Sequence, residues 1–142
     1  MRTAVFRFTD NYAPKEGTIK LHEDVIKSKK YVWYGVFGIG LSDKNVGIIL
    51  ENKEKKVLLV KSKTMECYWC DIENVTKDQP NPEYIPSYYR NDTSRVKTWI
   101  KISKIEKIDS SIIEKCTVIS TQKKLKDSIN KGMSSYFMVD ID

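Results

Sequence analysis

Several patterns that would mark a membrane, secreted or disulfide-bonded protein are missing from this 142-residue sequence. No apolar run approaches the roughly 20 residues that a membrane-spanning helix needs, so we expect no membrane partner. The first ten residues lack the hydrophobic segment and cleavage site of a signal peptide, which predicts a cytoplasmic protein. The three cysteines are an odd number, which argues against a disulfide framework.

Motifs that carry catalysis or bind metals are also scarce. The phosphate loop G-x-x-x-x-G-K-[ST], the dinucleotide fingerprint G-x-G-x-x-G and the zinc motif H-E-x-x-H are all absent. His22 is the only histidine, and a lone histidine on an amphipathic helix is typical of a surface or boundary position. Cys67 and Cys70 form a C-x-x-C pair, but only Cys116 and His22 could complete a zinc site. Residues three apart in a strand face opposite sides, so we expect these two thiols to diverge and predict no metal and no cofactor.

The composition that remains is that of an ordinary globular protein with an excess of positive charge. Hydrophobic residues make up 40% and charged residues 31% of the chain, and its length predicts a single domain over residues 1–142. Twenty-five lysines and arginines against nineteen acidic residues give a formal net charge of +6. This excess suits a polyanionic or phosphorylated partner, or else it merely keeps a small protein soluble.

The aromatic residues are unevenly distributed. Ten of the fifteen lie between Tyr31 and Trp99, in three groups. Lysines and arginines surround the last group, which contains Tyr88, Tyr89 and Trp99. Flat rings set among cations suit a ligand that is itself flat and anionic, such as a nucleobase on its phosphate backbone.

Hydrophobic periodicity predicts an α+β fold in which a small, curved, mainly antiparallel sheet or barrel packs against two helices. The first helix is expected over residues 18–29, with Thr18 as its cap and acidic residues early. The second is expected to begin at Ser120 or Thr121 and to end at Gly132, burying Leu125 and Ile129. Strands are expected at Thr3–Thr9, Tyr31–Ile39, Val46–Leu50, Val57–Lys61, Met65–Val75, Arg95–Ile102, Cys116–Ser120 and Tyr136–Ile141.

Two connections in this pattern are distinctive. The charged turn over residues 52–56 predicts a hairpin between Val46–Leu50 and Val57–Lys61, whose continuous apolar runs are typical of strands buried on both faces. Residues 77–93 form a long polar loop, and loops of this length are usually functional or mobile.

Trp99 lies in an alternating strand and shares its face with Lys97 and Lys101. The aliphatic residues Ile100 and Ile102 point the other way, because strand side chains alternate with period two. This pattern favours an indole on the lysine side, available for stacking on a base. The alternative is that Trp99 packs beneath the second helix while the lysines extend outward.

The long loop carries the second candidate group. Tyr88, Tyr89 and Arg90, with Arg95 just beyond, can stack a base and pair with a phosphate. The tyrosines can equally hold the loop onto the sheet.

A third group lies in the strand that begins near Tyr31. Alternation sends Trp33, Gly35 and Phe37 to one side and Tyr34 to the other. A glycine next to Trp33 leaves room for another group to approach the backbone closely. Trp33 is therefore either a pocket wall or part of the core.

The order of these elements resembles that of the PUA-like superfamily, which includes the EVE, ASCH and YTH domains. The resemblance covers roughly residues 18 to 108. It consists of a helix, the aromatic strand, the hairpin, a second aromatic strand leading into a Pro-Tyr loop, and the strand that bears Trp99. It implies a small curved barrel that binds RNA or modified bases in an aromatic pocket. By this resemblance the pocket residues are Trp33, Tyr34, Trp69, Tyr89 and Trp99, with Arg90 and Arg95 on phosphates.

Together these observations predict a non-catalytic module that binds a nucleobase-containing anion. The ligand is expected to be single-stranded or modified nucleic acid or a small nucleotide signal. Aromatic stacking and the cations Arg90, Arg95, Lys97 and Lys101 would hold it. Two other classes remain open: a module that binds a protein or sequesters a ligand in phage defence, and a metal-dependent nucleic-acid enzyme using carboxylates around Asp71 and Glu73.

Overall fold

The computed structural model describes residues 1–89, 92–131 and 134–142. Within these ranges the strands and helices are, in chain order, β1 (Arg2–Phe8), α1 (Thr18–Lys29), β2 (Val32–Phe37), α2 (Asp43–Glu51), β3 (Lys56–Lys61), β4 (Cys67–Thr76), β5 (Val96–Ile108), β6 (Cys116–Val118), α3 (Leu125–Ser128) and β7 (Tyr136–Ile141). Short 3₁₀ helices lie at η1 (Pro82–Tyr84), η2 (Ser87–Tyr89), η3 (Thr93–Arg95) and η4 (Ser110–Lys115). No helix in the described ranges is both long and apolar enough to cross a bilayer.

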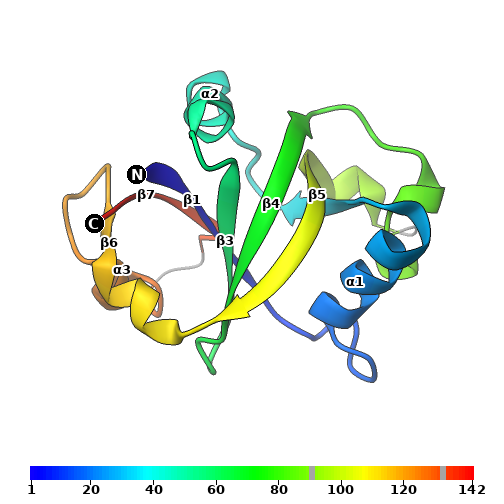
Figure 1. The fold of residues 1–142 in the computed structure, drawn as a ribbon, viewed down its shortest axis with the longest axis horizontal. Helices are drawn as coiled ribbons and strands as arrows, with labels where there is room; N and C mark the ends of the chain where they lie inside the picture. Colours follow the sequence, from blue (N-terminus) through cyan, green and yellow to red (C-terminus); the bar gives the residue numbers. More distant parts are fainter. Residues whose placement is uncertain (90–91, 132–133) are drawn as a thin grey trace.

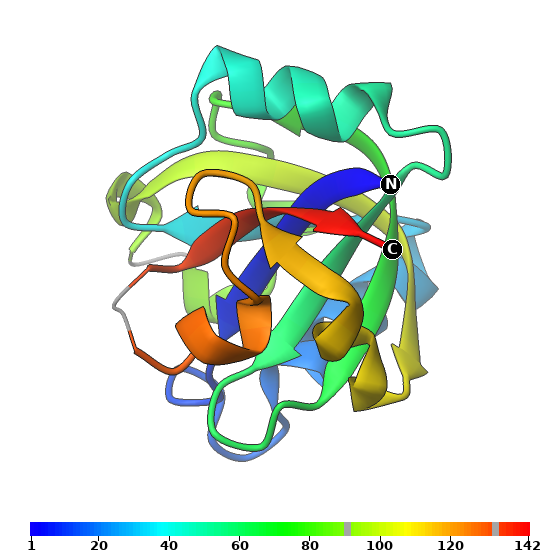
Figure 2. The ribbon, with the colours of Figure 1, turned by 90° about the vertical axis from the view of Figure 1, so that its left-hand side faces the viewer.

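The strands form one strongly curved sheet in the order β2-β5-β4-β3-β1-β7-β6 (Figures 1 and 2). Neighbouring strands are antiparallel except β1 and β3, which run parallel. Among the described residues β2 and β6 form the two edges, so the sheet stays open. These findings confirm the predicted α+β class and its curved, mainly antiparallel sheet. Figure 1 shows α1 and α3 at opposite ends of the molecule.

The curved sheet carries buried side chains on both faces. Val57 and Leu59 of β3 belong to one buried cluster, which includes residues of α2, whereas Leu58 and Val60 belong to another that includes β6, β7 and α3. This arrangement confirms that β3 is buried on both faces. Cys67 and Cys70 of β4 likewise fall into different clusters, so their side chains diverge as the strand periodicity predicts.

The prediction of a strand at Val46–Leu50 is wrong, because these residues lie in α2. The Ser42 side chain accepts the Asn45 N–H at 3.2 Å, which caps the helix. Ile49 is fully buried, and Val46 and Leu50 pack against the same cluster at helical spacing. A short apolar run is compatible with either a strand or a buried helix, and the Ser42 cap favours the helix here. Consequently the hairpin in this region joins β3 to β4 instead.

The first helix has the predicted bounds but a different cap. Gly17 occupies the cap position, and the first turn of α1 holds no acidic residue. Thr18 donates its hydroxyl to the Thr9 carbonyl, while the Asp10 carboxylate accepts the Thr18 N–H at 2.9 Å. The negative charge at the helix N-terminus therefore comes from another segment of the chain.

The second predicted helix is much shorter than expected. The structure has only Leu125–Ser128 in α3, with Lys124 at the N-cap position and no side-chain cap, and the predicted end at Gly132 lies outside the described residues. Gln122 takes a positive φ of 60°, and Thr117 pairs with Lys124, so the preceding residues form a turn. Leu125 and Ile129 are buried as predicted.

Candidate functional site

A cavity lined mainly by aromatic rings, here called the ring cavity, opens where β2, the segment after β1 and the 3₁₀ helix η2 meet. Its volume is about 160 Å³. The rings that line it are Phe8, Tyr12, Tyr34, Phe37, Tyr88 and Tyr89. Arg7, Thr9, Thr18 and Ser135 add polar groups, and Gly35 and Val36 of β2 complete the lining. A cavity of about 150 Å³ accommodates a benzene-sized molecule, so this one suits a single heterocycle.

The rings of the cavity are arranged as stacking surfaces. The Tyr12 ring lies nearly parallel to Phe37, with centroids 5.2 Å apart, and to Tyr88, with centroids 6.2 Å apart. Tyr89 stacks on Phe37 at 5.5 Å and contacts Tyr88 at 4.4 Å. Tyr12 is 42% exposed, whereas Tyr89 is buried. Most of these faces are used in packing the rings on one another, so the exposed Tyr12 ring is the one on which a planar ligand can stack.

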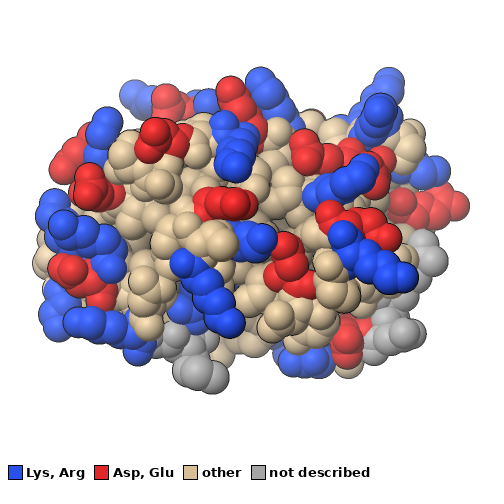
Figure 3. Space-filling view, turned by 90° about the horizontal axis from the view of Figure 1, so that it is seen from below, with Lys and Arg blue, Asp and Glu red and all other residues tan. Residues whose placement is uncertain are grey.

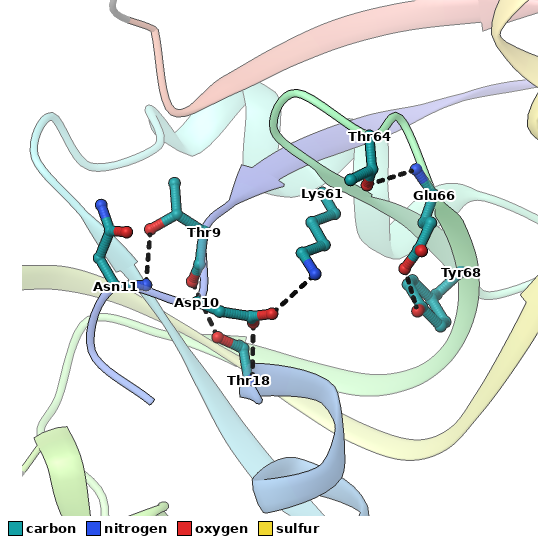
Figure 4. A network of polar contacts seen from close by, with 8 residues as sticks. All are labelled: Thr9, Asp10, Asn11, Thr18, Lys61, Thr64, Glu66 and Tyr68. Atoms are coloured by element: carbon teal, nitrogen blue, oxygen red, sulfur yellow. Dashed lines mark hydrogen bonds and ion pairs between the residues drawn. The ribbon is translucent and has the colours of Figure 1, made fainter. Parts of the chain in front are cut away.

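A polar network around Asp10 holds the segment that carries Tyr12 (Figure 4). Asp10 pairs with Lys61 of β3 at 2.8 Å and accepts the backbone N–H of Thr18. Burial opposes ionisation of this carboxyl group, but the bonds from Lys61 and Thr18 outweigh burial and lower its pKa. Both ends of the segment between β1 and α1 are thus tied to the sheet.

Tyr89 connects the loop to β2 and α1 through a buried chain of hydrogen bonds. Its hydroxyl oxygen accepts the Gly35 N–H at 3.1 Å and lies 3.4 Å from Nε2 of His22. Nδ1 of His22 lies 2.8 Å from the Thr18 carbonyl oxygen. A carbonyl oxygen only accepts, so Nδ1 carries the proton and Nε2 is free to accept the tyrosine hydroxyl.

Burial sets the charge states of this network. It lowers the pKa of His22 to about 4, although the bond to Thr18 favours the protonated ring. Burial likewise raises the pKa of Tyr88 to about 12 and that of Tyr89 well above its usual value. At neutral pH the imidazole and the phenols are therefore uncharged. The histidine is buried, so the expectation of a surface or boundary position is wrong.

The close approach predicted at Gly35 is made by the chain's own rings. A Cβ atom at this position would lie 2.9 Å from Cε1 of Tyr89 and 3.0 Å from Cζ3 of Trp99. The β2 faces follow the predicted alternation, because Val32, Tyr34 and Val36 belong to the cluster on the other face.

Trp99 lies on the predicted face of β5, but it is only 1% exposed. It packs with Ile85, Tyr89 and Val96, and half-buried Trp33 packs against the same cluster. The expectation of an open indole is wrong because the loop before β5 covers the ring. The alternative cover, the second helix, is wrong as well. Lys97 and Trp99 both line a separate hollow of about 550 Å³, away from the ring cavity.

The remaining residues selected from the sequence are dispersed. Trp69 packs in the cluster formed with β6, β7 and η4, so the structure does not bring it to the ring cavity. Lys101 lies 4.1 Å above the Tyr31 ring and pairs with Glu73 at 3.2 Å. Arg90 lies outside the described residues.

Arg95 is the predicted cation that the structure brings near the ring cavity. Its guanidinium carbon lies 5.6 Å from the centroid of Phe37, and its Nη1 is 3.9 Å from Asp92. Arg7, which the sequence reasoning missed, also lines the cavity. Arg7 precedes the segment that carries Tyr12, but the alternating pattern of β1 gives no signal that would single out Arg7 as a site residue. Tyr12 and Phe37 were missed as well, although the parity of β2 places Phe37 beside Trp33.

Acidic and basic side chains are interspersed on the face of the molecule shown in Figure 3. Lys20, Lys29, Lys61, Lys77, Lys101 and Lys104 each lie within 4 Å of a carboxylate. These six positive charges are therefore balanced locally. Local cation placement, rather than net charge, decides where an anion is favoured.

Among the residues that the structure describes, no three His, Cys, Asp or Glu side chains gather as a metal site would require. Burial raises the pKa of the Cys67 thiol to about 12 and that of Cys116 to about 11. These thiols are therefore protonated near neutral pH and are poor nucleophiles.

The family model described as Pua-like matches residues 4–135. The match includes the ring cavity's segments from Arg7 to Ser135 and ends just before β7. No curated protein and no solved structure matches the chain.

Proposed function

Because this chain belongs to the Pua-like family, we propose that it is a non-catalytic module that binds a nucleobase-containing anion in the ring cavity. The family assignment favours nucleic acid as the ligand class. The finer proposal covers single-stranded nucleic acid, a modified base within it, and a small nucleotide. In each case the base enters the ring cavity and the phosphate remains outside.

The observation that supports the proposal is a cluster of mutually stacked rings beside a space the size of one heterocycle. Tyr12, 42% exposed, is the ring of this cluster with a face open to a ligand, and the volume of about 160 Å³ matches that of one heterocycle. His22 and Tyr88 are uncharged near neutral pH, so the rings at this site suit an uncharged base. Stacking of this kind contributes roughly 1–3 kcal/mol per base.

Cations near the cavity rim support an anionic ligand. Arg95 lies over Phe37, and Arg7 lines the cavity beside Ser135. A guanidinium group suits phosphate because its N–H groups form a planar fork. We assign Arg95 the phosphate contact, and its long 3.9 Å approach to Asp92 leaves it available for exchange.

Binding titrations test this function. The probes are labelled single-stranded RNA and DNA and the eight common nucleoside monophosphates, each titrated across a salt series. We expect binding that weakens with salt and that falls about fivefold to 150-fold in Tyr12→Ala, the equivalent of one lost stack. Tyr31→Ala is the matched control, because Tyr31 stacks on Tyr84 outside the cavity. Absence of binding by every probe at low salt would overturn the proposal. Equal losses of affinity in Tyr12→Ala and Tyr31→Ala would show that the ring cavity is not the binding site.

A further inference from the structure

A larger cavity, here called the β7 groove, lies between α2, the chain after β6 and the first half of β7. Its volume is about 730 Å³, which is in the range typical of binding sites. In Figure 2, α2 lies above β7 (red), and the segment after β6 (orange) lies beside β7. The apolar side chains of its lining include Phe37, Ile39, Ile48, Ile119, Tyr136 and Met138. The groove is therefore a mainly apolar surface to which separate segments of the chain contribute.

One wall of this groove is a stretch of strand edge that lacks a partner strand. Hydrogen-bonding directions alternate along a strand, and the Ser135 carbonyl oxygen accepts a hydrogen bond from β1. The main-chain groups of Tyr136 and Met138 therefore point away from β1. On that side β6 pairs only with residues 139–141, and the Ile119 N–H donates to the Met138 carbonyl oxygen at 3.0 Å. Among the described residues, no hydrogen bond reaches the main-chain N–H or C=O of Tyr136 there.

This edge is open because the chain turns away from it after β6. The turn follows Ile119, and within it the Gln122 N–H donates to the Val118 carbonyl oxygen at 2.8 Å. Across the groove lies the end of β2, which is itself an edge strand of the sheet. An unpaired strand edge is a ready site for pairing with another extended chain. A segment that continues the line of β6 can therefore pair with Tyr136 and lie in the groove.

The lining of the groove indicates which side chains such a segment carries. Ile39 is 85% exposed and directly follows Gly38, whose φ is +87°. An isoleucine this exposed adds nothing to the core, but it can bury an apolar side chain of a bound segment. Lys44 is the one charged residue among the described residues of the lining. It is exposed and takes part in no ion pair with a described residue, so an acidic side chain complements it.

We propose that the β7 groove binds an extended segment of a protein partner as an added strand. The segment pairs with the main chain of Tyr136, packs apolar side chains against Ile39 and places an acidic side chain beside Lys44. The unpaired main-chain groups favour a peptide, because a peptide presents N–H and C=O groups at the spacing of a strand. This inference goes beyond the proposed function and does not depend on it, since Tyr12 is not among the described residues that line the groove.

Selection from a peptide library tests this proposal. Random peptides of about twelve residues, long enough to form one strand, are displayed on phage and selected on the wild-type protein. Excess Ile39→Asp protein in solution removes peptides that bind elsewhere, so the retained peptides depend on the groove. We expect retained sequences in which apolar and polar residues alternate and at least one residue is acidic, because alternate side chains of an added strand face the groove. Retention of no peptide would overturn the proposal.

Titration of a retained peptide, synthesised with a fluorescent label, measures the contribution of each groove residue. We expect Ile39→Asp to weaken binding about tenfold or more, because an apolar contact is lost. Lys44→Glu should weaken it about twofold to fivefold, and a lysine in place of the acidic residue of the peptide should restore the affinity. Lys27→Glu is the matched control, because Lys27 is exposed on α1, away from β6 and β7 (Figure 1). Ile39 and Lys44 are exposed too, so these substitutions spare the fold.

Amide hydrogen exchange tests the added strand itself. In the complex with the retained peptide, the Tyr136 amide should exchange at least about tenfold more slowly, because its N–H gains a partner. Tyr12→Ala should leave peptide binding unchanged, which separates this surface from the ring cavity. Unchanged exchange at Tyr136 would overturn the proposal, as would equal peptide affinity of the wild type, Ile39→Asp and Lys44→Glu. A loss of peptide binding in Tyr12→Ala as large as that in Ile39→Asp would also overturn it.

Discussion

The hydroxyl of Tyr89 accepts the backbone N–H of Gly35 at 3.1 Å, which joins residues 54 positions apart. This bond connects a 3₁₀ helix of the long loop to the edge strand β2. The same tyrosine ring stacks on Phe37 and forms one wall of the ring cavity. This buried hydroxyl group therefore contributes both to the position of the loop and to the shape of the cavity.

Tyr89→Phe tests this relationship directly. Removing the hydroxyl leaves the buried Gly35 N–H without this partner, so we expect the free energy of unfolding to fall by about 1–3 kcal/mol. Urea denaturation at neutral pH measures the change. Tyr31→Phe is the control: the Tyr31 hydroxyl has no hydrogen bond among the described residues, and its loss should cost less than about 0.5 kcal/mol. A Tyr89→Phe protein as stable as the wild type would show that the bond contributes nothing.

Stability should fall in mild acid because of His22. The folded-state pKa is about 4, below the ordinary value of 6.5, so the unfolded chain binds a proton first as the pH falls. Stability is thus complete above pH 6.5 and is lost progressively down to pH 4. Between pH 7.5 and pH 5 we expect a loss of about 2 kcal/mol from this group.

Urea denaturation of the wild type and of His22→Gln at both pH values measures that loss. The variant is expected to be less stable at pH 7.5, because the buried imidazole packs against Tyr34 and Tyr89. It should, however, lack the 2 kcal/mol difference between the two pH values. A variant with the same pH dependence as the wild type would assign the acid sensitivity to another group.

Gly35→Ala is expected to destabilise the fold by about 1–3 kcal/mol, the usual cost of overpacking. The new methyl group would meet the rings of Tyr89 and Trp99, neither of which can move without disturbing the loop. Thermal denaturation gives the shift. Gly47→Ala is the control and is expected to stabilise the fold. Gly47 lies in α2 with open space around its Cβ position, and alanine favours helix over glycine by about 1 kcal/mol. Stabilisation by both substitutions would contradict the close packing at β2.

Asp10→Ala should loosen the segment that carries Tyr12. The substitution removes the carboxylate at the N-terminus of α1 and the pair with Lys61, so we expect a loss of about 0.5–2 kcal/mol in stability. Chemical denaturation measures this loss, and tryptic cleavage after Lys15 reports whether the segment has become accessible. Asp24→Ala, which removes an exposed pair with Lys20, should change stability by less than about 0.5 kcal/mol. Matching effects from Asp10 and Asp24 would argue against a role for Asp10 in holding the segment.

Strand periodicity predicted which residues share a face but not which face solvent reaches. The alternation in β2 separates Tyr34 from Trp33 and Phe37, as the structure confirms. For Trp99 the same reasoning gave the correct face and the wrong exposure. Its cover comes from Ile85 and Tyr89, whose loop has no periodic pattern from which its position could be predicted.

Local sequence determined the bounds of α1, the course of most strands and the divergence of Cys67 from Cys70, since each depends on periodicity within one segment. Only the tertiary structure decided that Tyr12, Phe37, Tyr88 and Arg7 line one cavity, because these residues come from three separate stretches of chain. It also decided the neutral state of His22, which depends on burial by other segments. Short-range patterns fix local conformation, whereas a site depends on which distant segments the sheet order brings together.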